Sequence, residues 1–219
     1  MKVLILAGGK GTRIGGKKAL KPLLGKPLIY WVFQKIKNLS SPVYISVKTE
    51  QQEKEIKKAL IKEGVKIGKI VFIKDFYPEI EGPLSGIFSA LKIFSENETL
   101  LVLTVDQPLI NEETLHYLNI LSYIFCHKFL IVSKEEEKKI KPFPSIYPCS
   151  LKKEIEKFLF SSPKKSLFRL FQYLDTNQAI LFIKNNNKIS PENFININTL
   201  EDLKRVEKCF SQKLRSLKM

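Results

Sequence analysis

Cysteine and histidine are scarce in this chain of 219 residues, which has three cysteines and two histidines. Cys126, Cys149 and Cys209 are far apart in the sequence, and their odd number argues against a disulfide framework. They also lack the spacing of zinc ligands. Because His116 and His127 are the only histidines, a zinc site or a histidine-based catalytic triad is not expected.

Long apolar runs are also absent. The longest apolar stretch, from Leu115 to Val132, is interrupted by Asn119, His127 and Lys128, so a membrane-spanning helix of about 18 or more apolar residues is not expected. The segment from Met1 to Ala7 is too short for a signal peptide and continues into glycines. We therefore expect a cytoplasmic protein with no membrane partner.

Acidic residues are outnumbered, since 37 Lys and Arg face 22 Asp and Glu and the net charge is +15. Such a charge attracts nucleotides, phosphorylated metabolites or nucleic acid. Most of it is lysine on predicted helix faces, for example Lys54, Lys57 and Lys58, so a solvated surface explains it better than a dedicated polyanion site does. No platform of alternating aromatic and basic residues is visible, and we expect no nucleic acid partner.

Short apolar runs alternate with amphipathic stretches through residues 1–133. Strands are predicted at Val3–Leu6, Val43–Val47, Lys69–Ile73, Leu100–Val105 and Phe129–Val132, and helices at Pro27–Leu39, Glu50–Glu63, Pro83–Phe94 and after the N-cap Asn111. This alternation predicts an α/β fold, a mostly parallel sheet between two layers of helices.

The rhythm changes after Ser133. The sequence predicts a charged loop at Lys134–Lys141, an extended stretch at Pro142–Pro148, helices at Leu151–Leu159 and Ser166–Tyr173, a strand at Gln178–Ile183, a polar turn at Lys184–Pro191, and a last helix that Thr199 begins, with Asp202 completing a capping box. We expect residues 1–219 to form a single domain, in which residues 134–219 elaborate the side that receives a second substrate.

The strongest motif runs from Leu6 to Lys18, directly after the first strand, with the sequence LAGGKGTRIGGKK. Its five glycines, Gly8 and Gly9 among them, allow backbone N–H groups to approach phosphate oxygens. Arg13, Lys17 and Lys18 add positive charge that suits a triphosphate. The motif matches neither the dinucleotide fingerprint nor the P-loop; the alternative is a flexible basic turn.

Asp106 follows the fourth predicted strand, in the sequence LTVDQP. A carboxylate at the carboxyl end of a strand faces the ligand crevice of such folds and is a hard oxygen ligand suited to Mg²⁺. Its alternative role is to cap the turn before Pro108.

Two further segments leave alternatives open. The turn from Gly82 to Gly86 could offer N–H groups to a nucleotide or simply begin a helix with Pro83, and Asp75 could contact a nucleotide or belong to a turn. The alternation of Asn and Ile around Asn196 and Asn198 suggests a strand with both amides on one face, where they could bind substrate or water on a metal.

These segments, in this order, resemble the molybdenum cofactor guanylyltransferases. The likeness covers the opening LAGG with Arg13 and Lys18, the GPLSG turn that begins at Gly82, the VDQP around Asp106, the PSIY that begins at Pro144 and the closing NINTLEDL. It spans almost the whole chain, and the opening motif is shared with sugar-phosphate nucleotidyltransferases.

The resemblance implies a Rossmann-like nucleotide-diphospho-sugar transferase fold and a reaction that joins GMP from GTP to the phosphate of molybdopterin, with Mg²⁺ required. It implies nucleotide contacts at Leu6, Ala7, Gly8, Lys18, Asp75 and Asp106, with Asp106 also on the metal, and transient contact with cofactor-delivery proteins or target molybdoenzymes. The family often has Asn after strand two as a further GTP contact, where this chain has Ser46, and the loop before Lys18 is one residue shorter than in some members.

A mechanism follows as a hypothesis. The acceptor phosphate attacks the α-phosphorus of the nucleotide, Asp106 holds Mg²⁺, and Arg13 and Lys18 stabilise the leaving pyrophosphate. Other functions in question are cytidylyl transfer to the same acceptor, transfer to a sugar 1-phosphate, and nucleotide binding without turnover.

Overall fold

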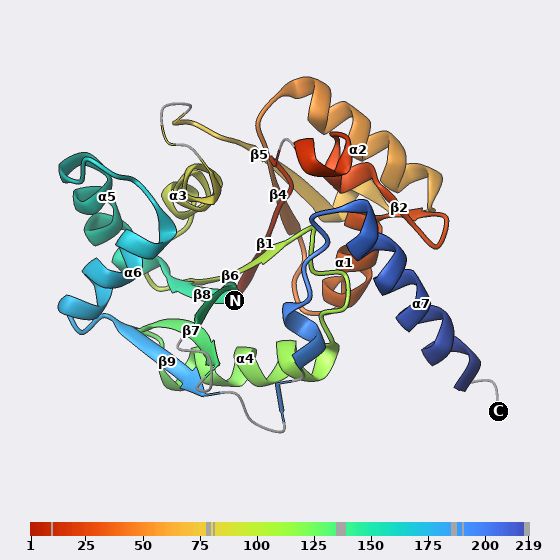
Figure 1. Cartoon of the computed structure of the whole chain (residues 1–219). Coiled ribbons are helices and arrows are strands. Elements are labelled where there is room, and N and C mark those ends of the chain that lie inside the picture. The colour runs from red at the N-terminus through yellow and green to blue at the C-terminus, as the bar shows by residue number, and fades with distance from the viewer. Residues whose placement is uncertain are drawn as a thin grey trace.

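One seven-stranded sheet forms the centre of the protein in a computed structural model, which describes residues 1–9, 11–77, 80, 82–134, 139–184, 188–189 and 191–216. The strands follow the order β5-β4-β1-β6-β8-β7-β9 (Figure 1). Their bounds are β1 Lys2–Leu6, β4 Val43–Val47, β5 Ile70–Lys74, β6 Thr99–Thr104, β7 Phe129–Lys134, β8 Lys139–Pro148 and β9 Ile180–Lys184. A short hairpin of β2 (Pro22–Leu23) and β3 (Lys26–Pro27) stands apart from this sheet.

The sheet is mostly parallel, as the sequence predicted. β1 pairs in parallel with β4 and β6, β4 with β5, and β7 with β9, whereas β8 runs antiparallel between β6 and β7. The position of β8 depends on pairs such as Val102 with Ser145, which lie far apart in the chain, so local periodicity could not predict it. Strands from both the first and the second part of the chain therefore share one sheet.

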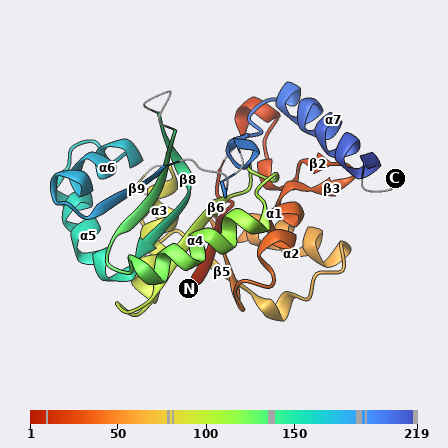
Figure 2. The same ribbon diagram turned by 90° about the horizontal axis from the view of Figure 1, so that it is seen from below.

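Three helices cover each face of the sheet (Figures 1 and 2). α1 (Leu28–Ile36), α2 (Glu50–Lys62) and α4 (Glu112–Ile124) pack on one face, and α3 (Pro83–Ile93), α5 (Lys152–Ser161) and α6 (Leu167–Thr176) on the other. Along β1, Val3 and Ile5 face the first layer and Leu4 faces the second, which is the period-two alternation of a strand buried on both sides.

The last helix, α7 (Leu200–Ser216), extends from the body of the protein toward the C-terminus (Figure 1). Val206 packs with Ile14, Leu23, Leu28 and Ile197 in a small core of its own. This core ties the start of α7 to the loop after β1 and to α1, so a late segment of the chain packs against an early one.

Three local predictions need correction or fall outside the described residues. Phe194–Asn198 is not a strand: Pro191–Phe194 is a 3-10 helix, and the following residues are irregular because Ile197 donates its N–H to the Asp106 carbonyl oxygen (2.8 Å) instead of joining a ladder. The predicted loop at 134–141 is wrong at Lys134, which belongs to β7, and at 139–141, which belong to β8; its residues 135–138 are not described. Residues 185–187 and 190 of the predicted turn, and Lys10 of the glycine-rich loop, are also not described. Within the described ranges, no helix has the length and apolar character needed to cross a bilayer.

Candidate active site

The carboxyl ends of β1, β4, β5 and β6 border one cavity of about 390 Å³. It lies where open α/β sheets bind ligands, and its size is that of a small-molecule site. The residues that line it are Leu6, Gly8, Gly9, Lys18, Ser46, Lys48, Asp75, Gly82, Pro83, Gly86, Thr104, Val105 and Asp106.

The loop after β1 presents its backbone to this cavity. Ala7 is fixed at both polar groups, since its N–H donates to Ser46 O (3.0 Å) and its carbonyl accepts from Gln52 Nε2 (2.7 Å). Gly8 and Gly9 follow and line the cavity, so phosphate oxygens can approach their N–H groups without a side chain in the way.

Gly11 turns the loop so that its backbone packs closely against Lys18. Its φ is +62°, and a Cβ there would lie 2.8 Å from the Cβ of Lys18, which no side chain permits. Lys18 follows at the start of a 3-10 helix (Lys18–Leu20). The glycine-rich stretch therefore positions this lysine as well as the backbone donors.

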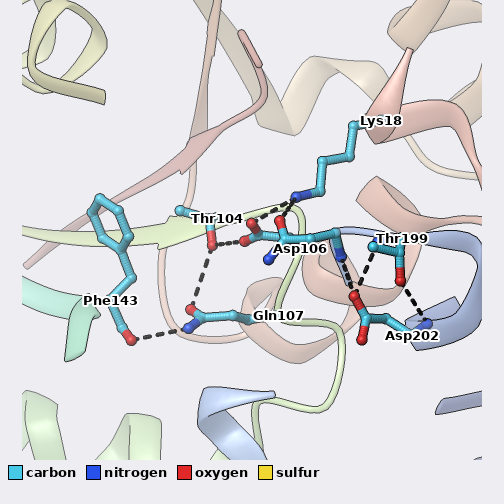
Figure 3. Close-up of polar contacts among 8 residues, drawn as sticks. Lys18, Thr104, Asp106, Gln107, Phe143, Thr199 and Asp202 are labelled. Atoms are coloured by element: carbon cyan, nitrogen blue, oxygen red, sulfur yellow. Dashed lines mark hydrogen bonds and ion pairs between the residues drawn. The ribbon is translucent and has the colours of Figure 1, made fainter. Parts of the chain in front are cut away.

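The Lys18 ammonium connects three distant segments (Figure 3). It donates to Asp106 Oδ2 (2.8 Å) and to Asn198 Oδ1 (2.7 Å). The side chains of Lys18 and Asp106 are 12% and 22% exposed, so the pair is only partly screened by solvent. Cation, carboxylate and amide, each predicted from a different motif, thus meet at one end of the cavity.

Asp106 is held from several directions. The Thr104 hydroxyl donates to its Oδ1, and Gln107, whose Oε1 lies 3.4 Å from that hydroxyl, donates from Nε2 to the Phe143 carbonyl (3.0 Å) (Figure 3). The backbone carbonyl oxygen of Asp106 accepts from the N–H of Ile197. These contacts fix the carboxylate at the end of β6, as an electrostatic site requires.

Asn198 owes its position to the cap of α7. The Thr199 hydroxyl accepts from Asp202 N (3.1 Å), and Asp202 Oδ2 accepts from the N–H groups of Asn198 and Thr199 (both 3.0 Å). The N–H of Asn198 is the main cause that lowers the pKa of Asp202. The predicted capping box is confirmed, and it also fixes the residue that contacts Lys18.

A second polar group lies at the opposite end of the cavity. Ser46, which is buried, donates from Oγ to Asp75 Oδ1 (2.9 Å). Burial raises the pKa of Asp75, against the lowering effect of hydrogen bonds from Ser46 and Ser85 and of the Lys48 charge. Gly82, with φ of +77°, turns the chain into α3 at this end.

Gly86 allows α3 to approach β1 and β4. A Cβ at this position would lie 2.3 Å from Ser46 Oγ and 3.0 Å from Leu6 Cδ2. We expect Gly86→Ala to displace the cavity wall, with a loss of about 1–3 kcal/mol in the free energy of unfolding and about tenfold weaker nucleotide binding. Chemical denaturation and equilibrium titration measure both quantities.

Gly68→Ala is the matched control, because a Cβ at Gly68 meets nothing within 4 Å and no positive φ is found there. If Gly86→Ala bound nucleotide as tightly as Gly68→Ala, the close packing at Gly86 would not shape the site.

The structure brings together most of the residues that the sequence singled out. Those that line the cavity are Leu6, Gly8, Gly9, Lys18, Ser46, Asp75, Gly82 and Asp106. Ala7 is buried with its backbone groups already bonded, and Asn196 is exposed outside the lining. Asn198 is outside the lining but contacts Lys18.

Arg13 is not brought into the cavity. It lies in a 3-10 helix (Thr12–Ile14) flanked by Gly11 and Gly15 in left-handed conformation, which turns Ile14 inward and leaves Arg13 exposed. Its role with the leaving group stays a prediction without support from this geometry.

Sequence reasoning missed Lys48 and did not assign roles to Thr104 and Gly86, which also line the cavity. Lys48 comes directly after β4, at the same edge of the sheet as Asp106. That position, just past the carboxyl end of a predicted strand, was a usable signal.

The side-chain oxygen atoms around Asp106 are of the kind that Mg²⁺ prefers. No group of three or more His, Cys, Asp or Glu that could hold a metal occurs among the described residues. Asp106, Asn198 and Thr104 each offer a side-chain oxygen atom. Mg²⁺ is bound in this way, through one or two carboxylates together with substrate phosphates and water.

Known proteins are similar to this chain in sequence and in fold. Residues 3–178 match the model of the MobA-like NTP transferase domain. A probable molybdenum cofactor guanylyltransferase of Clostridium perfringens is 32% identical over 90% of this chain and 91% of its own length. A molybdenum cofactor guanylyltransferase of Haemophilus influenzae is 29% identical over 94% and 96%.

A solved structure gives the same picture of the fold. Molybdopterin-guanine dinucleotide biosynthesis protein A from Archaeoglobus fulgidus superposes with a TM-score of 0.75 at 24% identity and covers 97% of this chain and 100% of its own. This likeness confirms the predicted Rossmann-like nucleotidyltransferase fold.

Proposed function

This chain belongs to the family of MobA-like NTP transferases and is a nucleotidyltransferase; we propose that it transfers GMP from GTP to the phosphate of molybdopterin, giving the guanine dinucleotide and pyrophosphate. The observation that carries the proposal is that the Lys18 ammonium contacts Asp106 and Asn198 in a cavity that Gly8 and Gly9 also line. The names of the relatives supply the acceptor and the donor.

The residues of the site act by positioning and by charge. An oxygen of the acceptor phosphate attacks the α-phosphorus of GTP, and the bond from that phosphorus to the bridging oxygen breaks as pyrophosphate leaves. The N–H groups of Gly8 and Gly9 and the ammonium of Lys18 bind the polyphosphate and offset the charge on the leaving group. No general base is needed, because a phosphate monoester is largely ionised near neutral pH.

Magnesium is part of this proposal. Asp106 would hold it, with Asn198 and Thr104 within reach as oxygen donors, and when bound the ion neutralises charge on the phosphates. With Asp106 on the ion, the Lys18 ammonium, which contacts that carboxylate in this structure, would be available to the phosphates.

We expect chelation of divalent ions to reduce transfer by at least about 10²-fold, since the phosphate charge is then offset by lysine alone. Pyrophosphate release measured with EDTA, and again after excess Mg²⁺ is added, checks this. EDTA saturated beforehand with Mg²⁺ is the control, and transfer that continues under free EDTA would contradict a metal at Asp106.

One experiment separates the proposed reaction from its rivals. The protein is incubated with Mg²⁺, an acceptor (molybdopterin or, separately, a sugar 1-phosphate) and GTP, CTP, ATP or UTP in turn, and products are identified by mass. We expect the guanine dinucleotide. The cytosine dinucleotide would show a cytidylyltransferase, product with a sugar 1-phosphate alone would show another acceptor, and nucleotide binding without product would show a regulatory module.

A further inference from the structure

Lys48 is a cation of the cavity for which the proposed reaction has no use. Its side chain lines the cavity, and the stem passes the loop after β1: a Cβ on Gly8 would lie 3.1 Å from Lys48 Cγ and 3.7 Å from Cε. Its backbone N–H donates to Gln52 Oε1 (2.9 Å), and Gln52 also holds Ala7. The lysine is therefore fixed at its base and directed along the cavity wall.

Unlike the lysines of the loop after β1, Lys48 keeps its ammonium free of bonds to the described residues. Lys18 bonds to Asp106 and Asn198, Lys17 pairs with Glu55 (2.8 Å), and Lys21 donates to Gly15 O (3.2 Å). Within the described part of the chain, Lys48 Nζ has neither a hydrogen bond nor an ion pair. Its donors remain for a ligand.

Asp75 is a carboxylate of the cavity that the charge of Lys48 affects. The two line the same cavity, and the charge of Lys48 acts on the Asp75 carboxyl without an ion pair between them. Ser46 orients this carboxyl through Oδ1. A donor and an oriented double acceptor thus face the cavity at the end away from Lys18 and Asp106.

We infer that Lys48 and Asp75 read the base of the nucleotide together, with the Lys48 ammonium donating to O6 of guanine and the Asp75 carboxylate accepting from N1–H and N2–H. The inference rests on the proposed function, whose donor it deepens, and it makes Lys48 a specificity-determining residue.

Guanine matches this pair better than the other bases do. Its edge has one acceptor beside two donors, and a carboxylate accepts two hydrogen bonds in parallel. Cytosine and adenine offer a single amino donor beside a ring-nitrogen acceptor, so one carboxylate oxygen would face a lone pair. Uracil places an acceptor on each side of its one donor, with the same result.

The test is equilibrium binding without acceptor, so it does not depend on turnover. GTP, GMP, guanosine and the triphosphate of 2-aminopurine riboside, which lacks O6 and the N1 hydrogen but keeps the 2-amino donor, are titrated into the wild type, Lys48→Met and Lys58→Met. Lys58→Met removes the same charge from an exposed site on α2, outside the cavity.

We expect Lys48→Met to weaken GTP, GMP and guanosine by the same factor, about tenfold, and 2-aminopurine riboside triphosphate by less than about twofold. Lys58→Met is expected to bind all four as the wild type does. A loss that grows with the number of phosphates and vanishes for guanosine would overturn the inference, because the lysine would then bind phosphate. An equal loss of affinity for GTP and for 2-aminopurine riboside triphosphate in Lys48→Met would also overturn the inference.

A second variant tests Asp75 by gain of function. Asp75→Asn should shift preference from GTP toward xanthosine triphosphate, because an amide can donate to O2 of xanthine where the carboxylate cannot. If Asp75→Asn weakened both triphosphates equally, with unfolding unchanged, the carboxylate would not read the base. A wild type that prefers CTP would instead remove GTP as the donor in the proposed function.

Discussion

Replacing Asp106 by alanine is expected to reduce nucleotidyl transfer by at least about 10³-fold, because the site loses the lining carboxylate that pairs with Lys18 and with it the proposed ligand for Mg²⁺. Steady-state release of pyrophosphate with GTP and molybdopterin measures the effect. GTP binding in the presence of Mg²⁺ should weaken far less, since Lys18 and the glycine N–H groups remain.

The fold should survive this substitution. Asp106 is partly exposed, its backbone bond to Ile197 is unaffected, and Lys18 keeps Asn198 as a partner. Asp175→Ala, which removes an exposed carboxylate on α6, is the matched control and should transfer at the wild-type rate. An Asp106→Ala protein that turned over like this control would exclude Asp106 from the reaction.

Lys18→Ala is the second variant with a large expected effect, a fall of about 10²- to 10³-fold in transfer. Contacts with Asp106 and Asn198 hold the ammonium in the cavity that Gly8 and Gly9 also line. It has the position to offset charge as pyrophosphate leaves, so the loss should lie mainly in kcat.

The neighbouring lysine provides a close control. Lys17 carries the same charge, but its side chain is 68% exposed, pairs with Glu55 and does not line the cavity. Lys17→Ala should therefore keep most of the activity. Equal losses in the two variants would mean that general positive charge, and not the position of Lys18, supports transfer.

Most of the fold could be predicted from the sequence because its local signals agree. Apolar strand runs, the caps at Asn111 and Thr199 and the glycine that ends α2 each act within a few residues, and the structure has the corresponding elements in place. The family resemblance and the rule that ligands bind at the carboxyl ends of parallel strands then predicted that Lys18 and Asp106 share one site.

The remaining features depend on contacts between distant segments. The antiparallel insertion of β8 depends on pairs between β6 and β8, and the irregular path around Asn196 follows from the bond of Ile197 to Asp106. Arg13 carries the charge that the site chemistry suggests, but two left-handed glycines turn it outward. Lys48 belonged to no motif, and only the packing of its stem beside Gly8 shows that it lines the cavity.

The most direct test of the account is a crystal structure of the protein with GTP and Mg²⁺ in the absence of acceptor. We predict the triphosphate between the backbone of Gly8–Gly9 and the ammonium of Lys18, with Asp106 turned from that lysine to the metal and the guanine beside Asp75. A triphosphate bound elsewhere, with the Lys18–Asp106 pair still intact, would contradict the claim that this cavity is the active site.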